Sequence, residues 1–304
     1  MGNEQRTKNR TNVGKIRSFF ASARFARLLP CIIVLLILLC TVFALFRRNS
    51  YTDACEGQLE IAFLDVGQGD ATLMILPDGG VVLIDCAEQE NADAVCRALL
   101  RRGLLQIDHL VLTHPHADHV GGGAQLAERF EVKNIWMTET DSVTYELSAL
   151  LYAAERRGTV LHTIAAGDLL PTGTVRTEVL SPPAGVNAGE NNDSVILLIT
   201  YNKVRFLLMG DAEAEAEAGI NCGRVDLLRV GHHGSDTSTT AAFLRRNTPG
   251  YAVVSCGTAN DYGHPHYEVL RRLENVNAVV LRTDTNGEIL ARTDGTELHV
   301  KTEK

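Results

Sequence analysis

One short segment, residues 113–122, constrains the fold of this chain more than any other part of it. It reads THPHADHVGG and therefore places three histidines and an aspartate within six positions. A largely apolar stretch at 107–113, typical of a buried strand, leads into it, and the two glycines at its end let a helix start close against the loop. Such a group of side chains is costly to place for packing alone. Because neutral imidazole is the commonest protein ligand for zinc and suits several other divalent metals, the segment predicts a metal site between a strand and a helix.

The spacing of these four polar side chains predicts two neighbouring metal positions. His114 and His116 are two residues apart on an extended segment, so they can point the same way. Asp118 and His119 lie at the turn into the helix and can reach a second position. A surface accident or a pH-sensing patch of histidines is the alternative, and the strand-to-helix context favours the metal site.

The N-terminal part of the chain has the pattern of a membrane anchor. Residues 28–46 contain no charged residue, and 19 residues of helix at about 1.5 Å each nearly span a hydrocarbon core of about 30 Å. Residues 1–27 carry seven basic residues and one acid, a net charge of +6; since the whole chain carries −8, residues 28–304 carry −14. The positive-inside rule then predicts a cytoplasmic N-terminus and an extracellular C-terminal domain. A lipoprotein anchored at Cys40 is the alternative, which the bulky Leu39 disfavours.

The rest of the chain alternates strand and helix patterns. We expect a basic cytoplasmic arm at 1–27, an uncleaved transmembrane signal anchor at 28–46, a linker at 47–57 and one domain at 58–304. Strands are expected at 59–64, 71–76, 81–84, 107–113, 134–137, 159–164, 175–180, 195–201, 205–209, 225–230, 251–255 and 278–282. Helices are expected at 91–102, 120–130, 239–246 and 267–273, with a solvent-exposed helix at 212–218. The dipeptides Asn286-Gly287 and Asp294-Gly295 predict hairpin turns. Mixed connections of this kind predict two sheets packed together with helices outside.

The histidine segment resembles the signature of the metallo-β-lactamase superfamily. Five further segments are similar, in order, to motifs of the hydrolase domain of ComEC-type competence proteins: FLDVGQGDA at 63–71, NNDS at 191–194, LMGD at 208–211, GHHGS at 231–235 and YGHPH at 262–266. The resemblance covers roughly residues 58–292. It implies a four-layer αββα sandwich with the site at one edge of the two sheets, and a metallo-β-lactamase-like hydrolase domain over 58–304.

The resemblance also implies roles for individual residues. It assigns His114 and His116 to a first metal; Asp118, His119 and His264 to a second; and Asp211 to a position between the two. Asp85 would orient the histidine loop from behind. From the residues alone, Asp211 is more often interpreted as a helix N-cap than as a ligand. One or two divalent ions, Zn²⁺ or Mn²⁺, are the expected cofactors.

One departure from the resemblance concerns the first metal. Many relatives supply a third histidine from the region of residues 190–194, but here that region reads ENNDS, so Asn191, Asn192 and Ser194 are the nearby polar candidates. An asparagine carbonyl is a harder and weaker ligand than imidazole, which favours Mn²⁺ or another oxygen-tolerant metal. His109 and His162 are interpreted as core or surface histidines with satisfied hydrogen bonds.

Other polar residues in the motifs have two interpretations each. His232 and His233 either bind metal, donate to the developing negative charge of the substrate, or brace the site; a catalytic or substrate-facing role is favoured for His232. Asp65, Gln68 and Asp70 either shape the pocket or belong to a tight turn that Gly67 and Gly69 permit. Asp118, His232 and His233 are the candidate catalytic residues.

The expected function is metal-dependent hydrolysis outside the membrane. A divalent metal lowers the pKa of a bound water towards about 7, and Asp118 would orient the resulting hydroxide. We expect a phosphodiesterase or nuclease acting on single-stranded DNA, although a body with a charge of −14 is unlike a tight electrostatic nucleic-acid binder. The alternatives are a hydrolase of a cell-envelope phosphate ester of the teichoic-acid type and a non-catalytic metal- or DNA-binding module. The membrane, through the N-terminal helix, is the other expected partner.

Overall fold

The chain divides into two compact units. They comprise Met1–Ser50 and Tyr51–Lys304. The computed structural model describes residues 23–54, 56–185 and 190–304. Every predicted site residue belongs to the second unit.

A single helix dominates the described part of the N-terminal unit. This helix, α2 (Ala23–Ala54), contains Pro30 and runs through the predicted anchor into the predicted linker. Most of the predicted basic arm lies outside the described residues. Over the ranges described, no helix combines the length and the apolar character that crossing a membrane requires.

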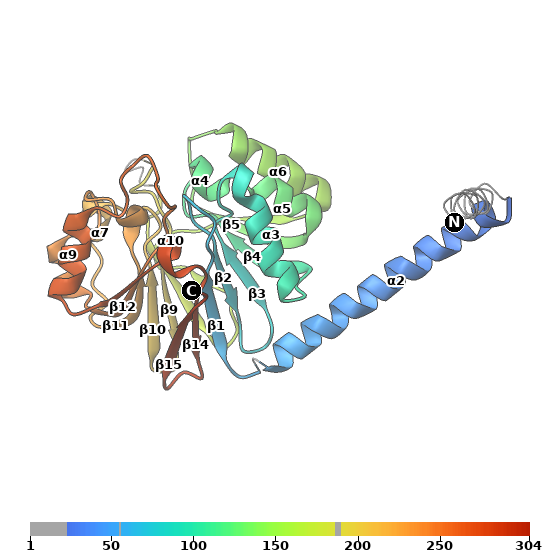
Figure 1. The fold of residues 1–304 in the computed structure, drawn as a ribbon. Coiled ribbons are helices and arrows are strands. Elements are labelled where there is room, and N and C mark those ends of the chain that lie inside the picture. Colours follow the sequence, from blue (N-terminus) through green and yellow to red (C-terminus); the bar gives the residue numbers. More distant parts are fainter. Residues whose placement is uncertain (1–22, 55, 186–189) are drawn as a thin grey trace, which may run out of the picture. The chain divides into compact units, whose positions relative to one another are not determined.

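The second unit is built on two sheets (Figure 1). The eight-stranded sheet has the order β15 (Leu298–Thr302), β14 (Ile289–Thr293), β1 (Leu59–Phe63), β2 (Thr72–Ile75), β3 (Val81–Ile84), β4 (Gln106–Val111), β5 (Glu131–Met137) and β6 (Val160–Thr163). The seven-stranded sheet has the order β13 (Val279–Arg282), β12 (Pro249–Val254), β11 (Val225–Arg229), β10 (Val204–Leu208), β9 (Ile196–Tyr201), β8 (Arg176–Ser181) and β7 (Leu169–Leu170). Both sheets mix parallel and antiparallel pairs, as the sequence pattern predicts.

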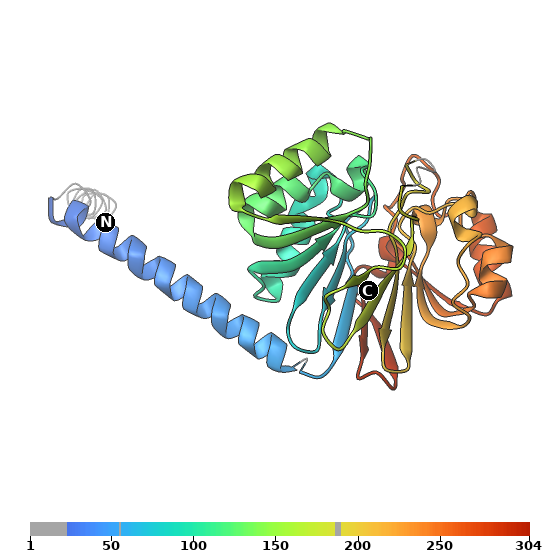
Figure 2. The same ribbon diagram turned by 180° about the vertical axis from the view of Figure 1, so that it is seen from behind.

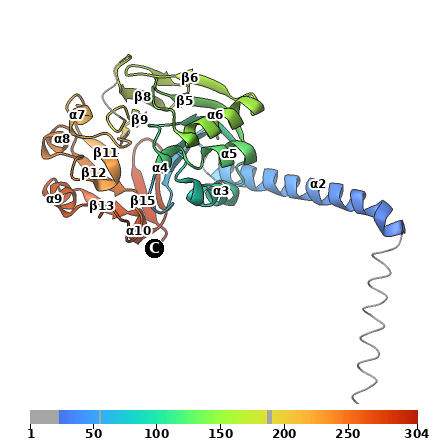
Figure 3. The ribbon, with the colours of Figure 1, turned by 90° about the horizontal axis from the view of Figure 1, so that it is seen from above.

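Three apolar cores separate four layers of secondary structure. One core lies between the eight-stranded sheet and the helices α3 (Ala92–Arg101), α5 (Gly123–Arg129) and α6 (Tyr145–Arg157). A second, which includes the fully buried Phe63 and Phe206, lies between the sheets. The third lies between the seven-stranded sheet and the helices α7 (Ala214–Glu217), α8 (Ala241–Arg246) and α9 (Tyr267–Asn275). Figures 2 and 3 show the helices on the two outer faces, which confirms the predicted αββα layering.

The polar motifs follow strands that end at one edge of the two sheets. Asp85 follows β3, and the histidine segment follows β4, which is parallel to β3. Asp211 follows β10, and the histidines 232 and 233 follow β11, which is parallel to β10. Because the carboxyl ends of parallel strands meet at the same edge, segments more than 100 residues apart converge there.

Several local predictions need correction. The helix predicted at 120–130 is two helices, α4 (Ala117–Val120) and α5, and between them the Gly122 amide donates to the carbonyl oxygen of Ala87 instead of to a helical carbonyl. The Asn286-Gly287 hairpin is wrong: the short helix α10 (Thr283–Asn286) ends there, and the chain crosses from one sheet to the other. Asp294-Gly295 does join an antiparallel pair, β14 and β15.

Two further differences concern helices. The structure adds α6, which the sequence analysis did not predict although its start and stop signals are present: Thr144 accepts a hydrogen bond from the Leu147 amide, and Gly158 ends the helix with a φ of 74°. In the predicted exposed helix 212–218, only 214–217 are helical and Glu217 is fully buried, because its carboxylate accepts hydrogen bonds from the amides of Thr239 and Thr240.

Candidate metal centre

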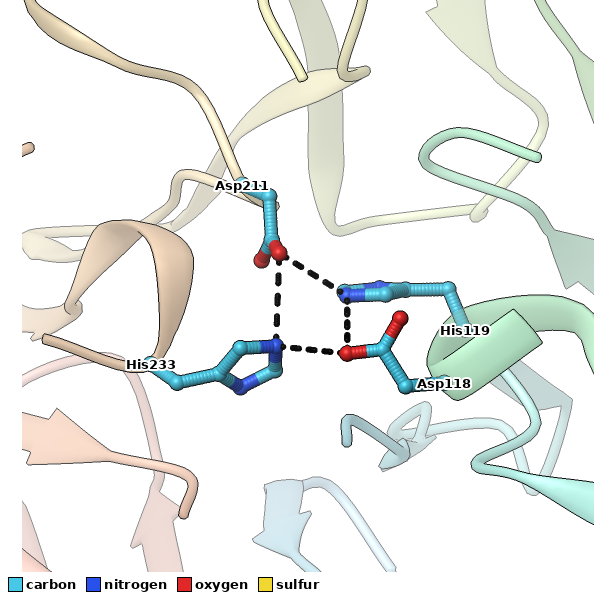
Figure 4. Close-up of side chains that lie close together, drawn as sticks. All are labelled: Asp118, His119, Asp211 and His233. Carbon is cyan, nitrogen blue, oxygen red and sulfur yellow. Dashed lines mark hydrogen bonds and ion pairs between the residues drawn. The ribbon is translucent and has the colours of Figure 1, made fainter. Parts of the chain in front are cut away.

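Four side chains converge at the edge of the sheets (Figure 4). Asp118, His119, Asp211 and His233, here called the buried cluster, each offer one ligand atom, and these atoms all lie within 4.8 Å of one another. Oδ2 of Asp211 is 3.2 Å from Nε2 of His119 and 3.3 Å from Nε2 of His233. Oδ2 of Asp118 is 3.1 Å from Nε2 of His233 and 3.8 Å from Nε2 of His119. Two carboxylates and two imidazoles thus face a common centre.

The outer nitrogens of both cluster histidines are held by acceptors behind them. Nδ1 of His119 is 2.7 Å from Oδ2 of Asp85, and Asp85 in turn accepts hydrogen bonds from the amide and hydroxyl of Thr113 at 2.8 and 2.7 Å. Nδ1 of His233 donates to the carbonyl oxygen of Ser255 at 2.9 Å. Fixing one ring nitrogen orients the other, so Nε2 of both rings is directed at the centre.

A buried arginine that the sequence analysis missed completes the surroundings of Asp211. Arg229 ends β11, is fully buried, and lies 2.8 Å from Oδ2 of Asp70 and 3.5 Å from Oδ1 of Asp211. The guanidinium therefore holds one oxygen of Asp211 while the other faces the histidines. An arginine directly after Leu227 and Leu228, two residues before the GHHGS motif, was the available signal.

The charges of the buried cluster favour a cation at its centre. Burial raises the pKa of Asp211, but His119 and His233 outweigh it and hold that pKa well below its usual range. Burial lowers the pKa of His233, but Asp211 and the hydrogen bond with Asp118 raise it to about 9. Without another cation, the carboxylates thus draw protons onto the imidazoles.

The donor set of the buried cluster fits a divalent metal. Nε2 of His119 is buried and has no hydrogen-bond partner among the described residues, although Asp118 and Asp211 lie near it. A buried polar atom of this kind normally has a partner. Two imidazole nitrogens and two carboxylate oxygens are ligands that Zn²⁺ accepts, and the oxygens also suit Mn²⁺.

His114 and His116, here called the histidine pair, lie next to the buried cluster. Nε2 of His114 is 3.0 Å from Nδ1 of His116, so the two rings converge on one point, as the spacing predicts. Nε2 of His114 is also 3.9 Å from Oδ2 of Asp211. Behind His114, Nδ1 lies 3.1 Å from the hydroxyl of Thr113 and 3.5 Å from that of Ser194, and Ser194 also accepts from the Asp211 amide. Asp211 therefore lies between the histidine pair and the histidines of the buried cluster.

The asparagines of the 190–194 region support the site from the side of α7. The side-chain oxygen of Asn192 accepts hydrogen bonds from the backbone amides of Glu213 and Ala216 at 3.0 and 3.4 Å, so it holds the start of α7. The side-chain NH₂ of Asn191 donates to Glu213, whereas its side-chain oxygen is buried and has no hydrogen-bond partner within the described part of the chain.

His232 and His264 line the centre without joining the buried cluster. Nε2 of His232 is 3.9 Å from Oδ2 of Asp211, and its Nδ1 is 3.2 Å from Oε1 of Glu213. The ring of His264 lies 5.6 Å from that of His232 and 6.2 Å from that of His233. Burial, together with these neighbouring histidines, lowers the pKa of His264 to about 4. The structure thus places His233, rather than His264, beside Asp118 and His119.

The FLDVGQGDA segment at 63–71 contributes contacts of three different kinds. Asp70 pairs with Arg229, and its amide donates to the carbonyl oxygen of Asp118. Gln68 accepts from the amide of Gly257, which follows β12. Asp65 is not brought to the site, because its carboxylate lies 3.4 Å from Lys304 at the surface.

The histidines at 109 and 162 are satisfied, as the sequence analysis interpreted them. His109 accepts a hydrogen bond from the indole of Trp136, and His162 stacks on that indole with a centroid separation of 3.9 Å and bonds Asn134. Neither histidine is part of either convergent group.

The chain matches the family model described as the metallo-beta-lactamase superfamily over residues 64–258. It belongs to that superfamily. ComE operon protein 3 of Bacillus subtilis is 33% identical over 276 residues, which cover 83% of this chain and 35% of that protein. Recombination protein 2 of Haemophilus influenzae is 30% identical over 261 residues, which cover 84% of this chain and 31% of that protein. The chain thus spans about a third of the length of these relatives.

The fold is also shared with solved structures of the superfamily. The metallo-beta-lactamase fold protein YhfI from Bacillus subtilis superposes with a TM-score of 0.55 at 12% identity, covering 77% of this chain and all of that one. At this identity the likeness concerns the fold alone. Family, fold and candidate centre together identify the second unit as a metallo-β-lactamase-type hydrolase domain with a possible metal site.

Proposed function

We propose that this protein is a metal-dependent phosphodiesterase that cleaves single-stranded DNA outside the cell membrane. The observation that carries the proposal is the buried cluster: two carboxylates and two oriented imidazoles around one centre, where Nε2 of His119 has no hydrogen-bond partner among the described residues. The competence-type relatives support nucleic acid as the substrate class.

The residues of the centre have separable roles in this proposal. A divalent metal, when bound, lowers the pKa of a water towards about 7 and so supplies a nucleophile at neutral pH. His119, His233, Asp118 and Asp211 would hold one such ion, and His114 and His116, with Asp211, a second. Zn²⁺ and Mn²⁺ are the proposed ions.

Two side chains face the space where the substrate phosphate would lie. Asp118 is partly exposed, and its carboxylate would accept a hydrogen bond from the attacking water and so orient it. His232 has its Nδ1 against Glu213, which leaves Nε2 directed at the centre, where it can hydrogen bond a phosphate oxygen. Hydrolysis then forms a bond from the water oxygen to phosphorus and breaks the bond to the leaving oxygen, which takes up a proton. Stabilising the negative charge that develops on phosphate is the main demand of such a reaction.

An aromatic surface beside the centre supports single-stranded DNA as the substrate. The ring of Tyr262 is 65% exposed and stacks on His264, with centroids 5.6 Å apart and planes inclined by 19°. An exposed ring offers its free face to a nucleobase, and stacking of this kind tolerates any base. Because a bound metal dominates the local field, the negative charge of the domain does not exclude an anionic substrate.

We also propose that residues 28–46 anchor the protein in the membrane, with the N-terminus in the cytoplasm and the hydrolase domain outside. The uncharged run and the basic arm before it support this arrangement. Cysteine labelling of the full chain in intact cells with a membrane-impermeant reagent tests it. Labelling of a cysteine introduced at the exposed Thr296, and none at Gln5, is expected; the reverse pattern contradicts it.

Substrate turnover by the full-length chain tests the enzymatic proposal. With Mn²⁺ or Zn²⁺, wild type should degrade single-stranded DNA and hydrolyse bis(p-nitrophenyl) phosphate, and Asp211→Asn should do neither. Turnover of the small ester with intact DNA would favour an envelope phosphate ester as the substrate. Bound metal without turnover of either compound would favour a non-catalytic module.

A further inference from the structure

The histidines around the centre share a pattern in how they are held. His119, His232 and His233 each have one ring nitrogen at the centre and the other against an acceptor: Asp85, Glu213 and the Ser255 carbonyl, respectively. His116 follows the same pattern with its nitrogens exchanged. Its Nδ1 faces His114 at 3.0 Å, and its Nε2 lies 2.5 Å from Oε2 of Glu190.

Glu190 is held in turn by a side chain from the opposite half of the fold. Its Oε1 accepts a hydrogen bond of 3.0 Å from the hydroxyl of Ser142, which lies between β5 and α6. Glu190 itself lies on the connection from β8 to β9, in the other sheet. The contact between Glu190 and His116 therefore joins two segments that are 74 residues apart in the sequence and belong to different layers.

We propose that Glu190 is a positioning residue that keeps the proton of His116 on Nε2 and thereby turns the Nδ1 lone pair towards the first metal position. The proposal rests on a metal binding at the histidine pair, as the proposed function assumes. A carboxylate against the outer nitrogen of a ligand histidine fixes both the tautomer and the ring orientation. Ser142 holds the second carboxylate oxygen and so limits the rotation of Glu190.

The position of Glu190 explains how this chain accommodates the ENNDS sequence. The region that carries a third histidine in the resembling proteins here contributes its carboxylate behind His116 rather than an imidazole at the centre. The carboxylate is remote from the converging nitrogens, because His116 has its ring between Glu190 and His114. The first metal position thus depends on a support that is 55% exposed, whereas Asp85 behind His119 is fully buried.

Metal titration of the full-length chain, purified without metal, tests this role. Glu190→Gln and Glu190→Ala are expected to weaken the binding of Mn²⁺ or Zn²⁺ at the histidine pair by about 10–100-fold, the usual cost of losing such a support, and to leave binding at the buried cluster unchanged. Ser142→Ala should weaken binding at the histidine pair by less. Glu90→Gln is the matched control, because it removes an exposed carboxylate that lines the same surface pocket as Ala117 and has no described contact with His116.

The tautomer of His116 in the metal-free protein provides the second readout. With ¹⁵N-labelled histidine, wild type should show His116 protonated on Nε2, assigned by comparison with His116→Asn, and Glu190→Ala should show a mixture of tautomers. An unchanged tautomer with weakened metal binding would make Glu190 a direct ligand and overturn the proposal. Unchanged metal binding in both Glu190 variants would also overturn it. Because neither readout requires DNA cleavage, failure of the nuclease proposal is separately visible.

Discussion

The two halves of the candidate centre are built from the same residue types but are supported differently. In the buried cluster, His119 and its partner Asp85 have no exposed side-chain surface, and Asp211 is held by the buried Arg229. In the histidine pair, His116 is 34% exposed and its partner Glu190 is 55% exposed. Preorganised donors bind an ion without first having to be ordered. We therefore expect the buried cluster to bind metal first and more tightly, and the histidine pair to bind second.

Substitution of Asp211 should impair metal binding at both halves of the centre, since its carboxylate lies between them. Asp211→Asn keeps the shape of the side chain but removes its negative charge. We expect activity below about 1% of wild type, a larger loss than the 10–100-fold that follows when an outer partner of a ligand is removed. Steady-state hydrolysis of bis(p-nitrophenyl) phosphate measures the loss. Activity within tenfold of wild type would remove Asp211 from its proposed role.

Substitution of Arg229 should destabilise the buried half specifically. Arg229→Met leaves Asp70 and Asp211 without their buried cation, so the free energy of unfolding should fall by about 3–5 kcal/mol. Urea denaturation of the metal-free chain measures this. Arg176→Met is the control, because Arg176 forms an exposed ion pair with Glu178 and should cost no more than about 1 kcal/mol. Equal effects of the two substitutions would contradict the structural role of Arg229.

Much of this arrangement follows from sequence, because strand ends are marked by strong patterns. The strand and helix patterns predict two packed sheets with helices outside, and the resemblance to the metallo-β-lactamase superfamily adds the edge where the site lies. The two-residue spacing of His114 and His116 also predicts their convergence, which the structure shows.

The choice between neighbouring histidines could not be predicted. His232 and His233 both have positive φ values, 48° and 52°, so the backbone there does not follow a regular period. Only the fold shows that His233 faces Asp118 while His232 faces Glu213. The role of Glu190 could not be predicted either, since its contact with His116 depends on how two loops that are distant in the sequence meet.

The supports of the two halves should be separable by metal titration. Asp85→Asn should weaken the tighter metal by about 10–100-fold, because the amide is a poorer partner for Nδ1 of His119. Glu190→Gln should instead weaken only the looser metal. Isothermal titration of both variants shows whether each support serves its own half. If Asp85→Asn affected only the looser metal, the order of the two positions would be reversed.

The narrowest expected effect concerns substrate binding beside the buried cluster, because it should reach only one of the two substrates. Tyr262→Ala removes the exposed ring that stacks on His264, and loss of one base contact of about 1–3 kcal/mol should raise KM for single-stranded DNA about 5–150-fold. Hydrolysis of bis(p-nitrophenyl) phosphate should be unaffected. Tyr267→Ala is the control, since Tyr267 is similarly exposed at 68% on α9. Parallel losses on both substrates would place Tyr262 in the support of the centre instead of the DNA surface.

Metal content of two single variants tests the central claim, that the tighter ion is held by Asp118, His119, Asp211 and His233. The full-length chain, His233→Ala and His264→Ala would be dialysed against limiting Zn²⁺ or Mn²⁺ and analysed for bound metal. His264→Ala is expected to retain the tight ion, and His233→Ala is expected to lose it. Retention by His233→Ala together with loss by His264→Ala would contradict the account.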